Sequence, residues 1–237
     1  MRISGLQKVT LLDYPEHIAA TIFLGRCNLR CPFCHNMELV ESPEHFPEIS
    51  IEEILNFLKS RIGRLNGVAI TGGEPLMNDD IEDLLKPIKE LGYSIKLDTN
   101  GFFPDLLKKI IADKLIDMVA MDIKSGYTNY LKVAGLDTFV DKSKVSLPER
   151  VKTSIGIIMN CGLNYEFRTT CVKGLHTEND FFEIKEIIKG AKNYFLQNYR
   201  ATDELKDMPF SSFDKSELTR FMDIVRDSVE NVSLRGI

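Results

Sequence analysis

Apolar segments rich in β-branched residues alternate with helical segments along most of the chain. The apolar segments are residues 18–24, 68–71, 94–98, 118–124, 165–171 and 193–199. Helical spacing follows each of them, over residues 51–62, 79–91, 104–115, 147–161, 179–191 and 215–230. Strands this apolar have no face for water, which is typical of parallel strands joined by right-handed helical crossovers. The pattern predicts an α/β fold built as an incomplete (β/α)6 barrel, similar to part of a TIM barrel.

The composition favours one ordinary globular domain. Of the 237 residues, 43% are hydrophobic and 27% are charged, and no Gly/Ser-rich linker or low-complexity tract divides the chain. We therefore expect a single domain over residues 1–237. The segment 125–146 is the least periodic, and we expect it to be a surface excursion.

Charge and hydropathy narrow the function classes. A net charge of −5 argues against sequence-independent binding to nucleic acid, which needs a clustered basic surface. Residues 1–20 include Asp13 and Pro15 where a signal peptide would need an apolar run, and no run reaches membrane-spanning length. We expect a cytoplasmic protein without a membrane or nucleic-acid partner, in a compartment where thiols stay reduced.

Three of the five cysteines lie within eight residues, in the segment CNLRCPFCHN directly after the first predicted strand. Cys27, Cys31 and Cys34 are separated by three and two residues. A structural zinc site needs four ligands, and a disulfide is disfavoured by the odd number of cysteines and by the compartment. A [4Fe-4S] cluster held by three cysteines would leave one iron open to an outside ligand. Cys161 and Cys171 are isolated and are interpreted as structural.

Polar residues also stand where other predicted strands end, the edge that carries the chemistry in parallel α/β folds. The second strand ends in TGGEP (71–75), whose glycines allow close backbone approach, although such a tetrapeptide is often only a turn. Asp98 and Lys124 end the next two strands, with helix capping and a solvated side chain as their simpler explanations. Arg168 lies within the fifth predicted strand. A structural ion pair and a functional role are equally expected for it there.

The C-x3-C-x2-C spacing resembles the signature of the radical S-adenosylmethionine (SAM) enzymes. This resemblance implies that Cys27, Cys31 and Cys34 hold a [4Fe-4S] cluster, whose fourth iron is chelated by SAM. Reductive cleavage of SAM would then release a 5′-deoxyadenosyl radical. Phe33 stands where this family usually places an aromatic residue against adenine, although a core position is an equal alternative.

The remaining motifs resemble the activating enzymes of glycyl radical proteins. The resemblance implies that Gly72, Gly73 and Glu74 hold the SAM amino group, and that Asp98 and Lys124 contact SAM, the lysine through the carboxylate. Further implied or candidate residues are Arg168 and Arg200 for the cofactor, Asp98, Thr99 and Asp122 for a monovalent cation, and Asp13 for the substrate loop. Arg200 departs from related enzymes, which carry a histidine there.

The resemblance extends over nearly the whole chain and is strongest to activators of anaerobic ribonucleoside-triphosphate reductase, close relatives of pyruvate formate-lyase activators. It implies a glycyl radical protein as partner, the reductase large subunit, and a low-potential electron donor such as flavodoxin or ferredoxin. The alternatives are an activator of another glycyl radical enzyme, a radical SAM enzyme acting on a small molecule, a zinc-binding module and an electron-transfer protein.

Overall fold

The computed structural model describes residues 1–136, 148–202, 205–206 and 208–237, which form two compact parts. The first part comprises Met1–Asn28, Asn36–Ala120 and Cys161–Asn164. The second part comprises Leu29–His35, Met121–Asn160 and Tyr165–Ile237. Strand β5 (Met118–Asp122) crosses the boundary, and so does the cysteine segment, which contributes Cys27 to the first part and Cys31 and Cys34 to the second.

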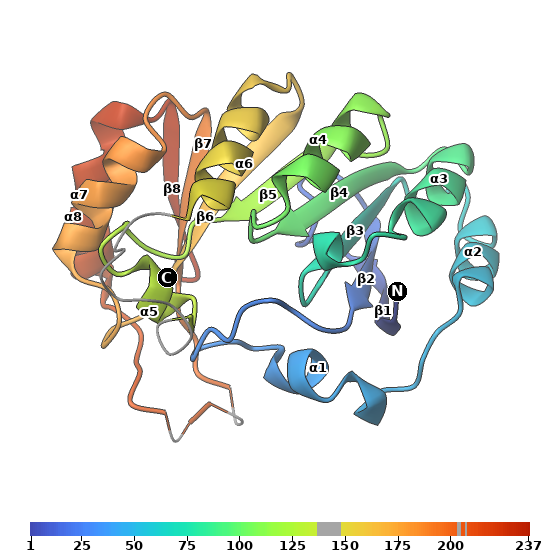
Figure 1. The fold of residues 1–237 in the computed structure, drawn as a ribbon, viewed down its shortest axis with the longest axis horizontal. Coiled ribbons are helices and arrows are strands. Elements are labelled where there is room, and N and C mark those ends of the chain that lie inside the picture. Colours follow the sequence, from blue (N-terminus) through green and yellow to red (C-terminus); the bar gives the residue numbers. More distant parts are fainter. Residues whose placement is uncertain (137–147, 203–204, 207) are drawn as a thin grey trace. The chain divides into compact units, whose positions relative to one another are not determined.

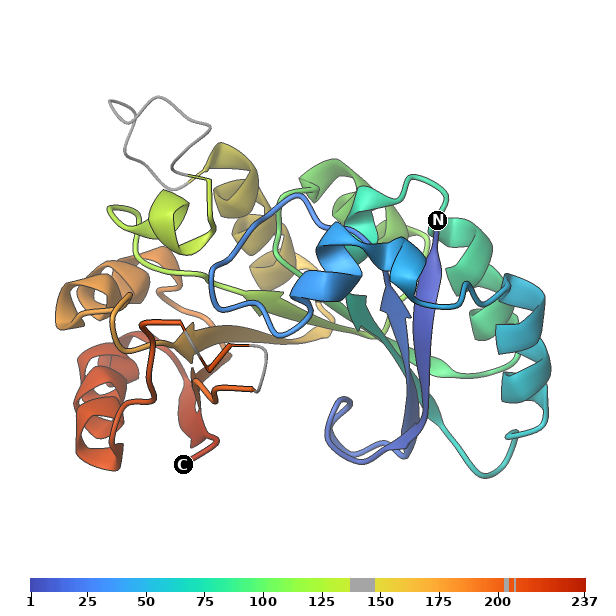
Figure 2. The same cartoon turned by 90° about the horizontal axis from the view of Figure 1, so that it is seen from below.

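The first part is a sheet with strand order β1-β2-β3-β4-β5 (Figure 1). Its other strands are β1 (Ile3–Thr10), β2 (Ala19–Leu24), β3 (Gly67–Gly72) and β4 (Ser94–Thr99). Strand β1 runs antiparallel to β2, joined to it by a loop that curls away from the sheet in Figure 2, whereas β2, β3 and β4 are parallel. Its helices are α1 (Met37–Glu41), α2 (Ile51–Lys59), α3 (Glu82–Glu90) and α4 (Pro104–Ala112).

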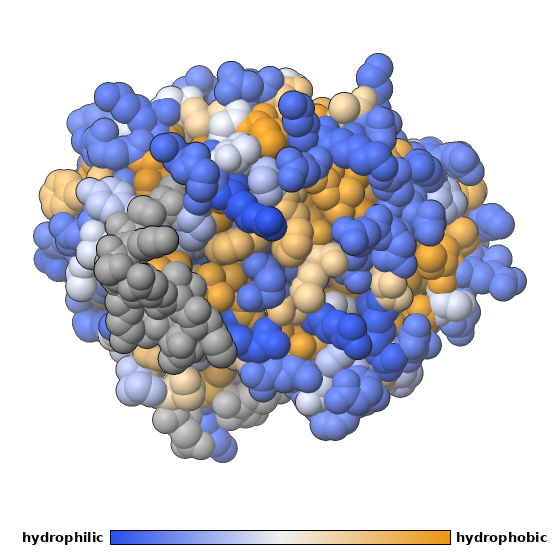
Figure 3. Space-filling view, in the orientation of Figure 1, coloured by the Kyte–Doolittle hydropathy of each residue, from blue (hydrophilic) through white to orange (hydrophobic). Residues whose placement is uncertain are grey.

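Helices α2, α3 and α4 are amphipathic, and each buries the centre of its apolar side. Ile54 and Leu58 of α2 and Leu84 and Leu85 of α3 have no exposed surface. In the view of Figure 3 the surface over α2 and α3 is mostly hydrophilic, with hydrophobic residues visible between the polar side chains. This division into one buried and one solvated side is what the helical spacing of the sequence predicts.

The second part continues from β5 in the order β6-β7-β8. Strands β6 (Asn164–Cys171), β7 (Asn193–Asn198) and β8 (Asn231–Arg235) are parallel. The helices are α5 (Tyr130–Val133), α6 (Glu149–Asn160), α7 (Glu178–Ile187) and α8 (Lys215–Val225). Every helix among the described residues is too short or too polar to cross a membrane.

The predicted α/β class with an open parallel sheet is confirmed, and the six predicted strands correspond to β2 to β7. Strands β1 and β8 were not expected, because their exposed positions leave little apolar signal. The short helices α1 and α5 also escaped prediction, α5 lying inside the expected excursion 125–146. Residues 137–147 of that excursion lie outside the described residues, and a single domain remains a prediction.

Candidate active site

In the first part, the loops that follow β2 and β3 are joined through their backbones. The Gly73 N–H donates to the Leu24 carbonyl at 2.7 Å, and the Glu74 N–H donates to the Arg26 carbonyl at 2.9 Å. A Cβ on Gly73 would stand 1.7 Å from the Arg26 carbonyl oxygen, and Gly72 has φ +112°. Only glycine fits the crowded position 73, and glycine is favoured at position 72 by its positive φ. The close approach permitted by these glycines is therefore to the backbone that leads into the cysteine segment.

Glu74 is a buried carboxylate with several donors. Its side chain is 1% exposed and accepts hydrogen bonds from the Thr99 hydroxyl at 2.8 Å and from the Asn100 backbone N–H at 2.6 Å. It also accepts from the Leu76 N–H at 3.1 Å. Buried carboxylates are stable only when their oxygens are bonded in this way. Glu74 therefore ties the turn after β3 to the end of β4.

Asn100 contacts the first cysteine and was missed by sequence reasoning. Its amide donates to the Asn28 side-chain oxygen at 2.8 Å and lies 3.7 Å from the Cys27 sulfur. Asn36 similarly donates to the Gly72 carbonyl at 3.0 Å. The signal for Asn100 was its place in the LDTNG segment, one residue beyond the two residues selected there.

Asp98 has a buried lysine beside it. Lys96 is 2% exposed and forms an ion pair with Asp98, which also accepts from the Thr71 hydroxyl at 3.2 Å. A buried ammonium requires such a carboxylate. The predicted cation ligands Asp98 and Thr99 are thus already engaged within the first part by Lys96 and Glu74, and the monovalent cation remains a prediction.

Asp13 lies in a turn and is held there by two threonine hydroxyls. Its carboxylate accepts from the Thr21 hydroxyl at 2.6 Å, and its N–H donates to the Thr10 hydroxyl at 3.3 Å. Its neighbours Leu11 and Leu12 are 70% and 90% exposed. The substrate-loop role of Asp13 remains a prediction.

In the second part, the remaining two cysteines lie on a loop fastened to the end of α5. The Arg30 N–H donates to the Ala134 carbonyl at 3.1 Å, and the Cys34 N–H donates to the Cys31 carbonyl at 3.0 Å. Cys31 is 7% exposed. Burial raises the pKa of the Cys31 thiol above its ordinary value, while the nearby Lys124 ammonium favours the thiolate and acts in the opposite direction.

Asp122, Lys124 and Arg168 form an ion-pair cluster at the end of β5 and within β6. The Asp122 carboxylate contacts the Lys124 ammonium at 2.9 Å and the Arg168 guanidinium at 3.0 Å. Burial disfavours the charged Asp122, but the two cations outweigh it and hold its pKa well below the usual range. Burial likewise disfavours the Lys124 ammonium, but Asp122 and Cys31 raise its pKa above the usual value. The structural ion pair expected as an alternative for Arg168 is present.

Two other predicted site residues, Phe33 and Arg200, make contacts outside this ion-pair cluster. Phe33 is buried and meets the ring of His176 edge-on, with centroids 6.5 Å apart. The side chain of Arg200 is exposed, while its carbonyl accepts from His35 Nε2 at 2.8 Å. Arg200 also lines a cavity of about 250 Å³ with Arg235.

Tyr130 carries a buried hydroxyl group that sequence reasoning did not single out. The residue has no exposed surface, and within the described chain its hydroxyl has no hydrogen-bond partner. Burial raises the pKa of Tyr130, and the Lys124 ammonium opposes that shift, as does the Lys124 backbone N–H, whose approach to the hydroxyl does not meet hydrogen-bond geometry. Its other charged neighbours are Cys31 and Asp122. Leaving a buried hydroxyl without a partner is costly, so such a group is often a contact for a bound molecule.

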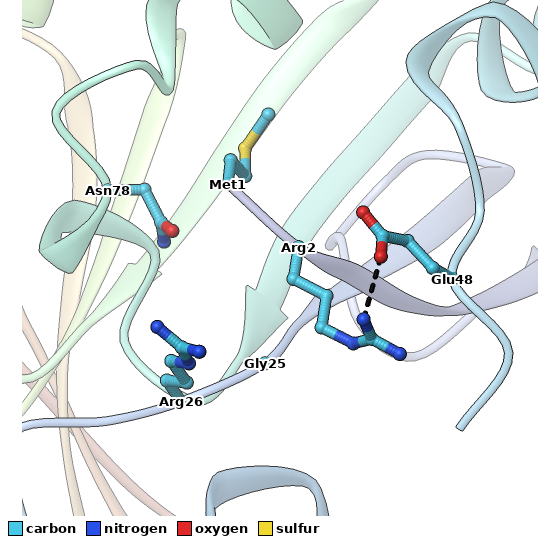
Figure 4. Close-up of a pocket in the computed structure, with 6 residues that line it drawn as sticks. All are labelled: Met1, Arg2, Gly25, Arg26, Glu48 and Asn78. Atoms are coloured by element: carbon cyan, nitrogen blue, oxygen red, sulfur yellow. Dashed lines mark hydrogen bonds and ion pairs between the residues drawn. The ribbon is translucent and has the colours of Figure 1, made fainter. Parts of the chain in front are cut away.

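A cavity of about 300 Å³ lies in the first part, next to the start of the cysteine segment (Figure 4). It is lined by Met1, Arg2, Gly25, Arg26, Glu48 and Asn78. The Arg2 guanidinium points to Glu48, with which it pairs at 2.7 Å. None of the predicted site residues is among these lining residues.

The sequence matches the family model of the radical SAM superfamily over residues 21–189, or 169 of 237 positions. The chain belongs to the radical SAM superfamily. Its members are enzymes that use a [4Fe-4S] cluster and SAM. A Methanocaldococcus jannaschii protein named "Putative glycyl-radical enzyme activating enzyme MJ1227" is 32% identical, covering 99% of this chain and 96% of that protein. The pyruvate formate-lyase-activating enzyme of Clostridium pasteurianum is 27% identical, covering 81% and 78%.

Solved structures support the same fold. The crystal structure of Streptococcus suis SuiB matches with a TM-score of 0.69 at 17% identity, covering 92% of this chain and 49% of that one. The chain therefore spans about half the length of this solved relative.

The residues present fit the cofactors of a radical SAM enzyme. The donor set contains three thiols in one segment, all reduced, as cluster ligands must be. The buried Tyr130 hydroxyl lies beside Cys31 and Lys124, where a bound anionic group would satisfy it. Among the described side chains, no three His, Cys, Asp or Glu form a ready metal site. Convergence of the three thiolates on one cluster therefore remains a prediction.

Proposed function

We propose that this radical SAM enzyme installs a glycyl radical on the large subunit of anaerobic ribonucleoside-triphosphate reductase. The observation that carries the proposal is the similarity over 99% of the chain to a protein named as an activating enzyme of glycyl radical enzymes. Similarity that extends from end to end favours the same class of substrate. The choice of the reductase rests on the resemblance of the whole set of motifs.

In this proposal, Cys27, Cys31 and Cys34 hold the cluster. The backbone of Gly72 and Gly73 and the nearby Glu74 hold the SAM amino group. When bound, the reduced cluster and SAM supply a 5′-deoxyadenosyl radical, which removes one hydrogen atom from the α-carbon of a backbone glycine.

The polar residues of the second part orient SAM and balance its charge. The Lys124 ammonium pairs with the SAM carboxylate, and Asp122 keeps Lys124 protonated. Phe33 packs against the adenine ring, while Asp13 and Arg200 are candidate contacts to the substrate loop and to SAM. Fixed charges of this kind position a substrate before the reaction begins. A low-potential donor such as flavodoxin or ferredoxin supplies the electron.

The test is anaerobic. Reconstituted enzyme, SAM and a reductant are mixed with the reductase large subunit, and electron paramagnetic resonance is recorded. We expect a glycine-centred doublet that disappears when the target glycine is replaced by alanine. A doublet with pyruvate formate-lyase but not with the reductase would correct the partner. SAM cleavage stimulated by a metabolite and not by a glycyl radical protein would instead indicate a radical SAM enzyme that acts on a small molecule.

A further inference from the structure

His176 is a buried histidine at the turn between β6 and α7. It is 4% exposed and packs against Phe33 and against Phe181, whose ring centroid is 6.3 Å away. Its backbone N–H donates to the Val172 carbonyl at 2.9 Å, and the Val172 N–H donates to His176 Nδ1 at 3.1 Å. Two hydrogen bonds therefore join Val172 and His176 across the turn, one between backbone groups and one from the Val172 backbone to the imidazole ring.

These contacts define the tautomer of the ring. A backbone N–H can only donate, so Nδ1 accepts and the ring hydrogen is on Nε2. His176 Nε2 lies 2.8 Å from the Lys124 carbonyl oxygen, which can only accept. Burial lowers the pKa of His176, although its contact with the Lys124 carbonyl acts in the opposite direction. The ring is therefore neutral, with one accepting and one donating nitrogen, both engaged.

The residue before Lys124, Ile123, is hydrogen-bonded to strand β6, which leads into the turn that carries His176. The Ile123 N–H donates to the Arg168 carbonyl at 2.8 Å, and the Thr169 hydroxyl donates to the Ile123 carbonyl at 2.7 Å. These two bonds fix the residue before Lys124 but leave the Lys124 carbonyl itself to His176. Without the ring, the Lys124 carbonyl would lose its hydrogen bond to the turn between β6 and α7.

We propose that His176 is a positioning residue that fixes the Lys124 backbone in the arrangement that binds SAM. This inference rests on the proposed function, which assigns the SAM carboxylate to Lys124. Residues that orient a binding group through a hydrogen bond commonly control affinity without touching the ligand.

Two substitutions separate this role from a purely structural one. In His176→Gln, the side-chain amide can reach the Nε2 position and still donate to the Lys124 carbonyl. In His176→Asn, the shorter side chain can replace only the Nδ1 acceptor for the Val172 N–H. Both variants remove the aromatic ring, so the lost packing is matched.

We expect the SAM dissociation constant of the reconstituted enzyme, measured by equilibrium dialysis, to increase about tenfold in His176→Asn and to stay within about threefold of wild type in His176→Gln. Equal affinities in the two variants would overturn the inference. Thermal unfolding of both cluster-loaded proteins is the measure of the structural contribution, which should be similar in the two.

Lys124→Ala distinguishes the two levels of the proposal. Wild-type SAM affinity in this variant would refute the assigned role of Lys124, on which the positioning role of His176 depends, but would leave the proposed class of substrate untouched. Weak binding in Lys124→Ala together with wild-type binding in His176→Asn would refute only the positioning role. Nitrogen-15 chemical shifts of the His176 ring provide a further readout, and a hydrogen on Nδ1 would contradict the inference directly.

Discussion

Several polar side chains of the second part are buried, and they differ in whether they have partners within the protein. The Asp122 carboxylate pairs with both Lys124 and Arg168, and the Tyr130 hydroxyl is buried near them without a hydrogen-bond partner among the described residues. A protein retains such a group when binding compensates for its cost, because burial without a hydrogen bond lowers the stability of the empty protein. The stability of the apoprotein is therefore a direct probe of this residue.

Tyr130→Phe should stabilise the apoprotein. Removing an unpaired buried hydroxyl should raise the free energy of unfolding by about 1 kcal/mol. The matched control is Tyr194→Phe, since Tyr194 is equally buried but its hydroxyl donates to the Thr169 hydroxyl at 2.8 Å. Loss of this hydrogen bond should lower the free energy of unfolding by about 1 kcal/mol. Urea unfolding of both variants measures the difference. Equal destabilisation would mean that the Tyr130 hydroxyl is already satisfied.

Site residues differ in how far the sequence revealed them. Cys27, Cys31 and Cys34 stand out because three thiols in eight positions are rare, and the glycines at 72 and 73 stand out because a turn after a strand needs them. Asn100 and His176 act through hydrogen bonds to backbone or side-chain atoms of residues distant in the sequence. A strand-end segment such as LDTNG marks the place of Asn100, but the partners of such residues depend on how separate strands are aligned.

At the level of elements, the strands with two buried sides were predicted and the edge strands were not. Strands β2 to β5 consist almost entirely of buried residues, so they appear as apolar runs. Strand β1 has three consecutive exposed residues and two register shifts against β2. Its formation depends on pairing with β2 and not on its own pattern. Periodicity cannot identify a strand of this kind.

Helix α2 depends on its first turn. The Ser50 hydroxyl accepts from the Glu53 N–H at 3.1 Å, and the Glu53 carboxylate accepts from the Ser50 N–H at 2.8 Å, which is a complete capping box. Ser50→Ala should destabilise the helix by about 1 kcal/mol. Ser60→Ala, at the other end of α2, should have a smaller effect. Amide hydrogen exchange within α2 measures both, and equal rates in the two variants would show that the cap contributes nothing.

At the scale of the whole molecule, the five cysteines should divide into two groups. Cys27→Ala, Cys31→Ala and Cys34→Ala should each lose the cluster after anaerobic reconstitution, because a ligand is removed. Cys161 accepts from the Leu163 N–H at 3.4 Å and Cys171 has no exposed surface, so their alanine variants should retain about four irons and as much sulfide per chain. Iron and acid-labile sulfide analysis tests this division. Uniform tolerance, or zinc in place of iron, would contradict it.

The contact between the loops after β2 and β3 limits how this fold can change. Because Gly73 and Glu74 are bonded to Leu24 and Arg26, neither loop can gain or lose a residue before its motif without displacing the other. The two motifs are far apart in the sequence, but each constrains the other in the fold. A chimera that receives the cysteine segment of another enzyme should therefore also receive that enzyme's Gly-Gly-Glu-Pro turn.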